Sequence, residues 1–288
     1  MKREAVTVVG LGPMGRAMAD AFLDQGRRVT VWNRTAGKAD DLVAAGAHRP
    51  ADLRDALVAS DLVLVSLRDQ DAVTALLAPE VAALRDRVLV NLSSGTPDEA
   101  RATAAWAAEH GVAYLQGGPR VPPSGIGLPE SVTFYSGPKD VFESCRDDLA
   151  VLTSADYRGT DPGLAMVYYQ LEEALLWMTM TGYLHAVAVA QANGISAGDL
   201  LPYATRTLAS GGELLAFYAP RIDAGDHEGE FDSVGSAAAG IDHVVRTSRD
   251  AGVDAHVPEA VLQLFHRGAA NGRANDSSTS LIDVLRTG

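Results

Sequence analysis

The sequence predicts a doubly wound α/β domain with a mainly parallel sheet, followed by an all-helical domain that a long helix joins to it. Two observations support this fold class. Short apolar runs alternate with helical patterns until this alternation stops near Gly159, and a long apolar stretch without proline then begins at Gly163. We therefore expect domains at residues 1–162 and 163–288, with the connecting helix over residues 163–193.

The first domain contains six runs with the length and composition of buried strands, at residues 5–9, 29–32, 61–66, 88–92, 112–115 and 131–135. Because helical patterns separate these runs, we expect a parallel sheet with helices on both faces.

A glycine-rich turn joins the first strand to the first helix. Its residues are Gly10, Leu11, Gly12, Pro13, Met14 and Gly15. In this context the first glycine allows a tight turn, the second lets the backbone approach a diphosphate, and the third lets the helix pack closely on the sheet. The helix N-terminus then binds the diphosphate. The turn predicts a dinucleotide site in a Rossmann-type domain.

The end of the second strand selects the dinucleotide. NAD sites usually have an acidic residue there to bind the ribose hydroxyls, whereas this chain has Asn33, Arg34 and Thr35, with Lys38 nearby. A guanidinium can bind a 2′-phosphate through two hydrogen bonds. We therefore predict NADPH as the cofactor. The alternative is a surface turn that is basic by chance.

Two further strand ends lie on the edge of the sheet where such folds bind ligands. One carries Ser66 and Leu67, and the other carries Ser93, Ser94, Gly95 and Thr96. We expect both to contribute to the cofactor site, with the nicotinamide near residues 94–96. Thr96 followed by Pro97 also fits a simple helix start, and the two interpretations are compatible.

The composition excludes several other classes of protein. The net charge of −13 disfavours nucleic acid, and the 47% hydrophobic content of the 288 residues argues against disorder. A single cysteine, Cys145, and the lack of ligand-spaced histidines predict no metal site. No apolar run reaches the ~20 residues of a membrane span. We expect a cytoplasmic protein that binds neither membrane nor nucleic acid.

The long helix is apolar on all sides, so it must be buried on all sides. At ~1.5 Å per residue it would span roughly 40 Å, which is more than a small helical domain can cover. We therefore expect a homodimer, the alternative being burial within one chain.

Several motifs together identify a family. They are GLGPMG at residues 10–15, WNRT at 32–35, NLSSGTP at 91–97, VPP at 121–123 and GLA at 163–165. With them the chain resembles the NADPH-dependent imine reductases, or reductive aminases, within the superfamily of 3-hydroxyisobutyrate and 6-phosphogluconate dehydrogenases. The resemblance implies hydride transfer to small, cyclic imines, a 6-phosphogluconate dehydrogenase-like helical domain, an active site between domains of two chains, and (S)-amine products. It leaves open whether the protein also joins an amine to a carbonyl compound.

The start of the long helix separates this activity from that of hydroxyacid dehydrogenases, which have a lysine where this chain has Tyr169. Reduction of a ketone builds negative charge on oxygen and benefits from a cation, whereas reduction of an iminium ion discharges a cation. The resemblance implies that Tyr169 faces the nicotinamide as the catalytic residue, donating a proton or only orienting the substrate. We expect substrate contacts from Glu173, Trp177 and Met180, on the same helical face, and from Arg120, where relatives have a small or apolar residue.

Two other functions remain possible from the sequence. One is a 3-hydroxyacid dehydrogenase-like oxidoreductase, which would need another residue in place of the missing lysine. The other is an NADPH-binding sensor without turnover. For the individual residues, the alternatives are that Tyr169 packs in a dimer core and that Glu173 is a solvated or ion-paired residue.

Overall fold

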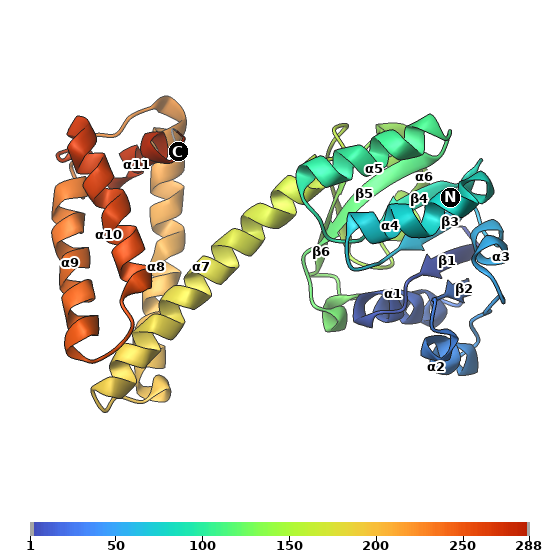
Figure 1. Cartoon of the computed structure of the whole chain (residues 1–288), viewed down its shortest axis with the longest axis horizontal. Helices are drawn as coiled ribbons and strands as arrows, with labels where there is room; N and C mark the ends of the chain where they lie inside the picture. The colour runs from blue at the N-terminus through green and yellow to red at the C-terminus, as the bar shows by residue number, and fades with distance from the viewer. Residues whose placement is uncertain (1–2, 287–288) are drawn as a thin grey trace. The chain divides into compact units, whose positions relative to one another are not determined.

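The computed structural model describes residues 3–286, and these form two compact units that divide after Ala174. Helix α7 (Leu164–Ala192) begins in the first unit and ends in the second. The division therefore falls within the long helix, about three turns after its start, by the ~3.6 residues of each turn. Figure 1 labels most of the elements of both units.

The first unit is built on one sheet with the strand order β2-β1-β3-β4-β5-β6-β7. Its strands are β1 (Ala5–Val9), β2 (Arg28–Trp32), β3 (Leu62–Val65), β4 (Val88–Asn91), β5 (Ala113–Pro119), β6 (Val132–Ser136) and β7 (Ser154–Gly159). Every neighbouring pair is parallel except β5 and β6, which are antiparallel. The predicted fold class, a mainly parallel α/β domain followed by a helical domain, is confirmed.

Side chains alternate between the two faces of the sheet, and helices cover both faces. In β3, Leu62 and Leu64 belong to one core with residues of α1 and α6, whereas Val63 and Val65 belong to the other with residues of α3, α4 and α5. The helices of this unit are α1 (Pro13–Asp24), α2 (Asp40–Ala44), α3 (Leu53–Val58), α4 (Gln70–Leu77), α5 (Pro97–Glu109) and α6 (Lys139–Leu149). Apolar residues therefore pack on both faces of the sheet.

The last strand, β7, was not predicted. Its residues are mostly polar and only partly buried, because it lies at the edge of the sheet and pairs with β6 alone. An edge strand has less apolar surface to bury, so its sequence carries a weaker hydrophobic pattern. β5 is also longer than expected, since it continues through Gly117 and Gly118 to Pro119.

The second unit is helical. After the end of α7 it contains α8 (Ala197–Ala224), α9 (Val234–Asp250), α10 (His256–Gly268) and α11 (Leu281–Arg286). Its two small cores come mainly from α9, α10 and α11, whereas none of the 28 residues of α8 is buried. Within residues 3–286, no helix has both the length and the hydropathy needed to cross a membrane.

Candidate functional site

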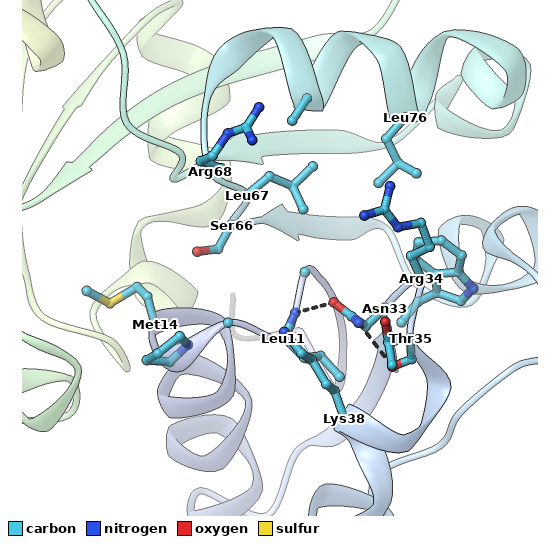
Figure 2. Close-up of a pocket in the computed structure, with 15 residues that line it drawn as sticks. Leu11, Met14, Asn33, Arg34, Thr35, Lys38, Ser66, Leu67, Arg68 and Leu76 are labelled. Atoms are coloured by element: carbon cyan, nitrogen blue, oxygen red, sulfur yellow. Dashed lines mark hydrogen bonds between the residues drawn. The ribbon is translucent and has the colours of Figure 1, made fainter.

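A cavity of about 580 Å³ opens at the carboxyl ends of β1, β2 and β3 (Figure 2). Eleven of the predicted cofactor residues line it: Gly10, Leu11, Gly12, Pro13, Met14, Asn33, Arg34, Thr35, Lys38, Ser66 and Leu67. Trp32, Arg68, Ala72 and Leu76 complete the wall. Ala72 and Leu76 had no distinguishing signal in the sequence, because they are ordinary apolar residues of α4.

The glycine turn at one side of this cavity is held by close packing. Gly10 has φ +93°, and a Cβ there would lie 2.2 Å from the Ser66 carbonyl oxygen. A Cβ at Gly15, which is not among the lining residues, would be 1.9 Å from the Gly10 carbonyl oxygen. Gly12, by contrast, has no such neighbour within 4 Å and forms the N-cap of α1 without a side-chain hydrogen bond. The first N–H groups of α1 are therefore available to an anion.

In the turn after β2, the side chain of Asn33 forms hydrogen bonds to the backbone, and Arg34 and Lys38 are basic. The Asn33 side chain accepts a hydrogen bond from the Leu11 N–H at 3.1 Å and donates one to the Thr35 carbonyl at 3.0 Å (Figure 2). Arg34 and Lys38 are exposed and, within residues 3–286, their side chains form no ion pair. Of the residues between 3 and 286 that line the cavity, none is acidic. These residues fit a dinucleotide with a 2′-phosphate.

The predicted segment Ser93–Thr96 lies beyond the lining of this cavity but is bonded to its wall. The Ser93 hydroxyl accepts a hydrogen bond from the Leu67 N–H at 2.9 Å. At the other end of the segment, Thr96 and Glu99 form a capping box that starts α5. Between them, the Gly95 carbonyl accepts a hydrogen bond from the Gln170 side chain of α7 at 2.9 Å. The segment thus connects the cavity wall to the first turns of α7.

A buried network of side chains lies under this segment. The Asn91 amide donates to Gln70 at 2.6 Å and to the Tyr114 hydroxyl at 3.1 Å, and that hydroxyl donates to Gln116 at 2.5 Å. Gln70 donates to the Ser93 carbonyl at 3.2 Å, while the Ser93 N–H donates to Asn91 at 3.0 Å. Burial raises the pKa of Tyr114, so its phenol stays protonated as a donor. The network fixes the backbone of Ser93.

Sequence reasoning missed Gln70, Tyr114 and Gln116 as parts of this network. The available signal was the presence of amide side chains beside or within apolar segments, with Asn91 and Gln116 in strands and Gln70 at the start of α4. Such amides are buried only when they are hydrogen-bonded, so their positions indicated a network but not its partners.

Helix α7 packs closely against β5 at a glycine. A Cβ at Gly118 would lie 3.1 Å from the Tyr169 Cβ and 3.2 Å from the Ala165 carbonyl oxygen. The Ser136 hydroxyl accepts a hydrogen bond from the Ala165 N–H at 2.8 Å and so anchors the first turn of α7. These contacts place Tyr169 beside the carboxyl end of β5, one residue before Gln170 and its contact with Gly95.

Arg120 follows β5 and reaches the same turns of α7. Its guanidinium lies 5.7 Å from the centre of the Tyr169 ring, donates through Nε to Glu172 at 2.7 Å and donates through Nη1 to Glu173. The sequence analysis predicted Arg120 and Glu173 as substrate contacts, without predicting that they pair with each other. The cation comes from the sheet and is ion-paired with two carboxylates.

Two other predicted substrate residues, Trp177 and Met180, belong to the second unit. Both lie on α7 in its exposed part, with 61% of Trp177 and 37% of Met180 accessible to solvent.

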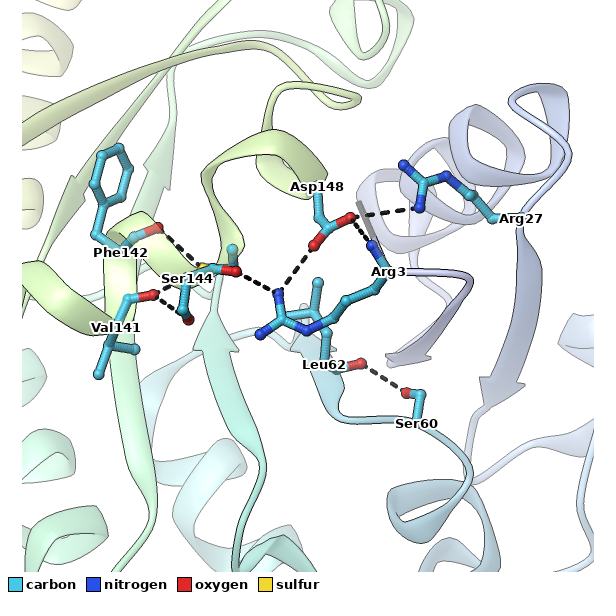
Figure 3. Close-up of polar contacts among 9 residues, drawn as sticks. Arg3, Arg27, Ser60, Leu62, Val141, Phe142, Ser144 and Asp148 are labelled. Atoms are coloured by element: carbon cyan, nitrogen blue, oxygen red, sulfur yellow. Dashed lines mark hydrogen bonds and ion pairs between the residues drawn. The ribbon is translucent and has the colours of Figure 1, made fainter. Parts of the chain in front are cut away.

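Helix α6 carries two buried groups that lie outside the cavity. Asp148 accepts hydrogen bonds from the Arg3 backbone N–H at 3.0 Å and from the Arg3 guanidinium at 2.9 Å, and Arg27 lies 3.5 Å away (Figure 3). Cys145 is buried as well, and burial raises the pKa of its thiol to about 11. The contacts of Asp148 attach Arg3 to α6. The raised pKa of Cys145 keeps its thiol protonated.

Comparison with known proteins adds family information to this geometry. Residues 161–287 match the family described as NADPH-dependent reductive aminase-like, C-terminal domain. Residues 5–153 match the NAD binding domain of 6-phosphogluconate dehydrogenase.

Individual relatives cover nearly the whole chain. The NADPH-dependent reductive aminase of Aspergillus oryzae is 31% identical over 287 residues, which are 98% of this chain and 97% of that protein. The solved structure of an imine reductase from Bacillus cereus BAG3X2 is 50% identical, with a TM-score of 0.94 over 99% of this chain and 100% of that one. A reductive aminase from Aspergillus terreus, solved with NADPH4, cyclohexanone and allyl amine, is 35% identical, with a TM-score of 0.92 over 99% and 100%. The chain therefore belongs to the family of NADPH-dependent imine reductases and reductive aminases.

Proposed function

We propose that this protein reduces C=N bonds, transferring a hydride from NADPH to small imines or iminium ions to give amines. The observation that carries the proposal is the position of Tyr169, beside two carboxylates and one ion-paired guanidinium, at the place where a dehydrogenase would have a lysine. The related Aspergillus terreus enzyme was solved with a ketone and an amine, which supports the same substrate class.

Cofactor binding uses the cavity at the end of β1 and β2. Bound NADPH would supply the hydride at its nicotinamide ring. The open N-terminus of α1 binds the diphosphate, and Arg34 and Lys38 bind the 2′-phosphate. Ser93 to Thr96 support the nicotinamide end, because this segment bridges the cavity wall at Leu67 and helix α7 at Gln170.

Tyr169 acts on the substrate nitrogen. Its phenol can donate a hydrogen bond to that nitrogen and, when the imine arrives neutral, a proton. The nearby carboxylates favour the protonated substrate, which is the more electrophilic form. They would oppose the negative charge that develops on oxygen when a ketone is reduced. Glu173, Trp177 and Met180 complete the substrate site in this proposal.

The working form is a homodimer. Apolar side chains of the second unit remain exposed on α7 and α8, including Leu175, Met178, Leu184, Leu208 and Leu215 at 56–75% accessibility. A cavity of about 420 Å³ between these two helices is lined mostly by apolar residues. Apolar surface of this extent is typical of a protein interface, so a second copy would cover it and bring its own domain to the active site. The protein acts in the cytoplasm, in agreement with its one unpaired cysteine.

The proposed activity is tested by supplying both kinds of substrate to the purified protein. With NADPH and 2-methyl-1-pyrroline we expect loss of absorbance at 340 nm and formation of 2-methylpyrrolidine, enriched in the (S) form. With NADP⁺ and 3-hydroxy acids we expect no reduction of the cofactor. Turnover of hydroxy acids alone would identify a dehydrogenase, and tight NADPH binding without any turnover would identify a sensor.

The role of Tyr169 is tested with a neighbouring tyrosine as control. Tyr169→Phe removes the phenol and should lower kcat by ~10²-fold or more, the usual contribution of a positioned proton donor. Tyr168→Phe removes the same group from a ring that packs on Phe134, and it should retain activity within about threefold. Equal activity of the two variants would contradict the role of Tyr169.

A further inference from the structure

Arg120 is held in one orientation by contacts on both sides. Its backbone N–H donates to the Val132 carbonyl at 3.1 Å, which ties the residue to the start of β6. Its side chain, only 18% exposed, reaches α7 and pairs with Glu172 and Glu173 while lying against the Tyr169 ring. A planar guanidinium can bridge two carboxylates in this way because its donors point in fixed, different directions.

The formal charge of this cluster follows from its members. One guanidinium and two carboxylates leave a net charge of −1. Glu173 is the more buried of the carboxylates, at 26% exposure compared with 47% for Glu172. Charges in a partly buried cluster are screened less than those on an open surface. Arg120, Glu172 and Glu173 therefore place a formal charge of −1 beside the phenol of Tyr169.

A substrate in reach of this cluster is selected by its own charge. An iminium ion with a single positive charge matches the charge of −1, whereas a second cation on the same substrate would face Arg120 with no carboxylate left to pair with. Without Arg120, the two carboxylates would match two positive charges.

We propose that Arg120 is a specificity-determining residue that limits the enzyme to singly charged iminium substrates. This inference rests on the proposed function, since it assumes that the substrate nitrogen binds near Tyr169. Arg120 acts by neutralising one of two carboxylates and takes no part in hydride or proton transfer.

The test varies the charge of the cluster in steps. The wild type has a charge of −1, Arg120→Gln has −2, Glu172→Gln has 0, and the double variant with both changes returns to −1. Arg146→Gln is the matched control, because Arg146 also pairs with a glutamate but lies on α6 at 57% exposure.

Each protein is assayed with 2-methyl-1-pyrroline and with an analogue that carries a trimethylammonium group three carbons from the ring. The measured quantity is the ratio of kcat/KM for the pyrroline to kcat/KM for its cationic analogue. We expect this ratio to fall about tenfold in Arg120→Gln, the size of effect that one unit charge at a few ångströms has in a partly buried site. It should rise in Glu172→Gln, return to the wild-type value in the double variant, and stay unchanged in Arg146→Gln. The differences in this ratio between the variants should become smaller in high salt, because salt screens the charges.

A binding measurement separates this inference from the proposed activity. Calorimetry of the NADP⁺-loaded proteins with the two product amines should give affinity ratios in the same order as the charges. If imines are reduced but the ratios do not follow the cluster charge, the inference about Arg120 is wrong and the activity stands. If the binding ratios follow the charge but no imine is reduced, the proposed activity is wrong. A double variant that behaves like Arg120→Gln would overturn the inference, because geometry rather than charge would then decide selectivity. The absence of both binding and turnover would also overturn it.

Discussion

Replacement of Gln116 by methionine should both destabilise the protein and slow its reaction. Gln116 accepts hydrogen bonds from Tyr114 at 2.5 Å and Gln70 at 3.3 Å, and donates to the carbonyls of Asn91 and Gly117 at 3.0 Å each. In Gln116→Met, Gln70 retains its bond to Ser93 and the Tyr114 hydroxyl retains the bond from the Asn91 amide. The Tyr114 hydroxyl loses the acceptor for its proton, and the Asn91 carbonyl loses the Gln116 amide donor. An unsatisfied buried polar group costs about 1–3 kcal/mol, so two of them should lower the free energy of unfolding by about 3 kcal/mol.

The catalytic part of this prediction follows from the position of the network under Ser93. We expect kcat to fall at least about tenfold, because a small displacement of a supporting segment misaligns the reacting atoms. The KM for NADPH should change by less than about threefold, because the phosphate contacts lie on other loops. The assays are urea-induced unfolding and steady-state kinetics with 2-methyl-1-pyrroline.

A matched control removes a buried hydrogen-bonding group far from the proposed site. The Ser60 hydroxyl lies before β3, 2.8 Å from the Thr7 hydroxyl, and donates to the Leu62 carbonyl at 2.8 Å. Ser60→Ala should reduce stability without reducing kcat. Unchanged stability of Gln116→Met, or a kcat no lower than that of Ser60→Ala, would show that the network does not support Ser93.

Three further predictions concern other parts of the first unit. Arg34→Ala should raise the KM for NADPH by about 10–100-fold and change the KM for NADH by less than about threefold, since only NADPH loses a charge pair. Steady-state kinetics measure both values, and an equal change for the two cofactors would contradict this prediction. Asp148→Ala should lower the free energy of unfolding by about 3–5 kcal/mol, because Arg3 and Arg27 lose their common carboxylate, and urea unfolding at the wild-type midpoint would disprove it. Because burial raises the pKa of Cys145 to about 11, the thiolate should be scarce at pH 8, and Ellman's reagent should label the folded protein far more slowly than the unfolded one. Equally fast labelling would contradict the buried position of this thiol.

Local chemistry made the cofactor cavity predictable from sequence. Gly10 and Gly12 lie in a turn whose geometry depends on residues adjacent in the chain, and Arg34 follows directly after a strand. In each of these features, the residues that act together are close to one another in the sequence. The structure places them around one cavity, because parallel strands bring their carboxyl ends to the same edge of the sheet.

Features that depend on distant residues could not be predicted in the same way. Arg120 and its carboxylate partners are 52 and 53 residues apart in the sequence. Their pairing depends on how α7 packs against Gly118, and no local pattern specifies that packing. The same holds for Gln70 and Gln116, which are 46 residues apart. The polar strand β7 was missed because its position at the sheet edge, rather than its own sequence, decides how much apolar surface it buries.

Transfer of a labelled hydride shows whether this protein reduces the carbon of a C=N bond. NADPH deuterated at both C4 positions is incubated with the protein and 2-methyl-1-pyrroline, and the product is analysed by NMR spectroscopy and mass spectrometry. We expect one deuterium per molecule of 2-methylpyrrolidine, on the ring carbon that bears the methyl group. Product without deuterium at that carbon, or no product while a keto acid is reduced with the label, would contradict it.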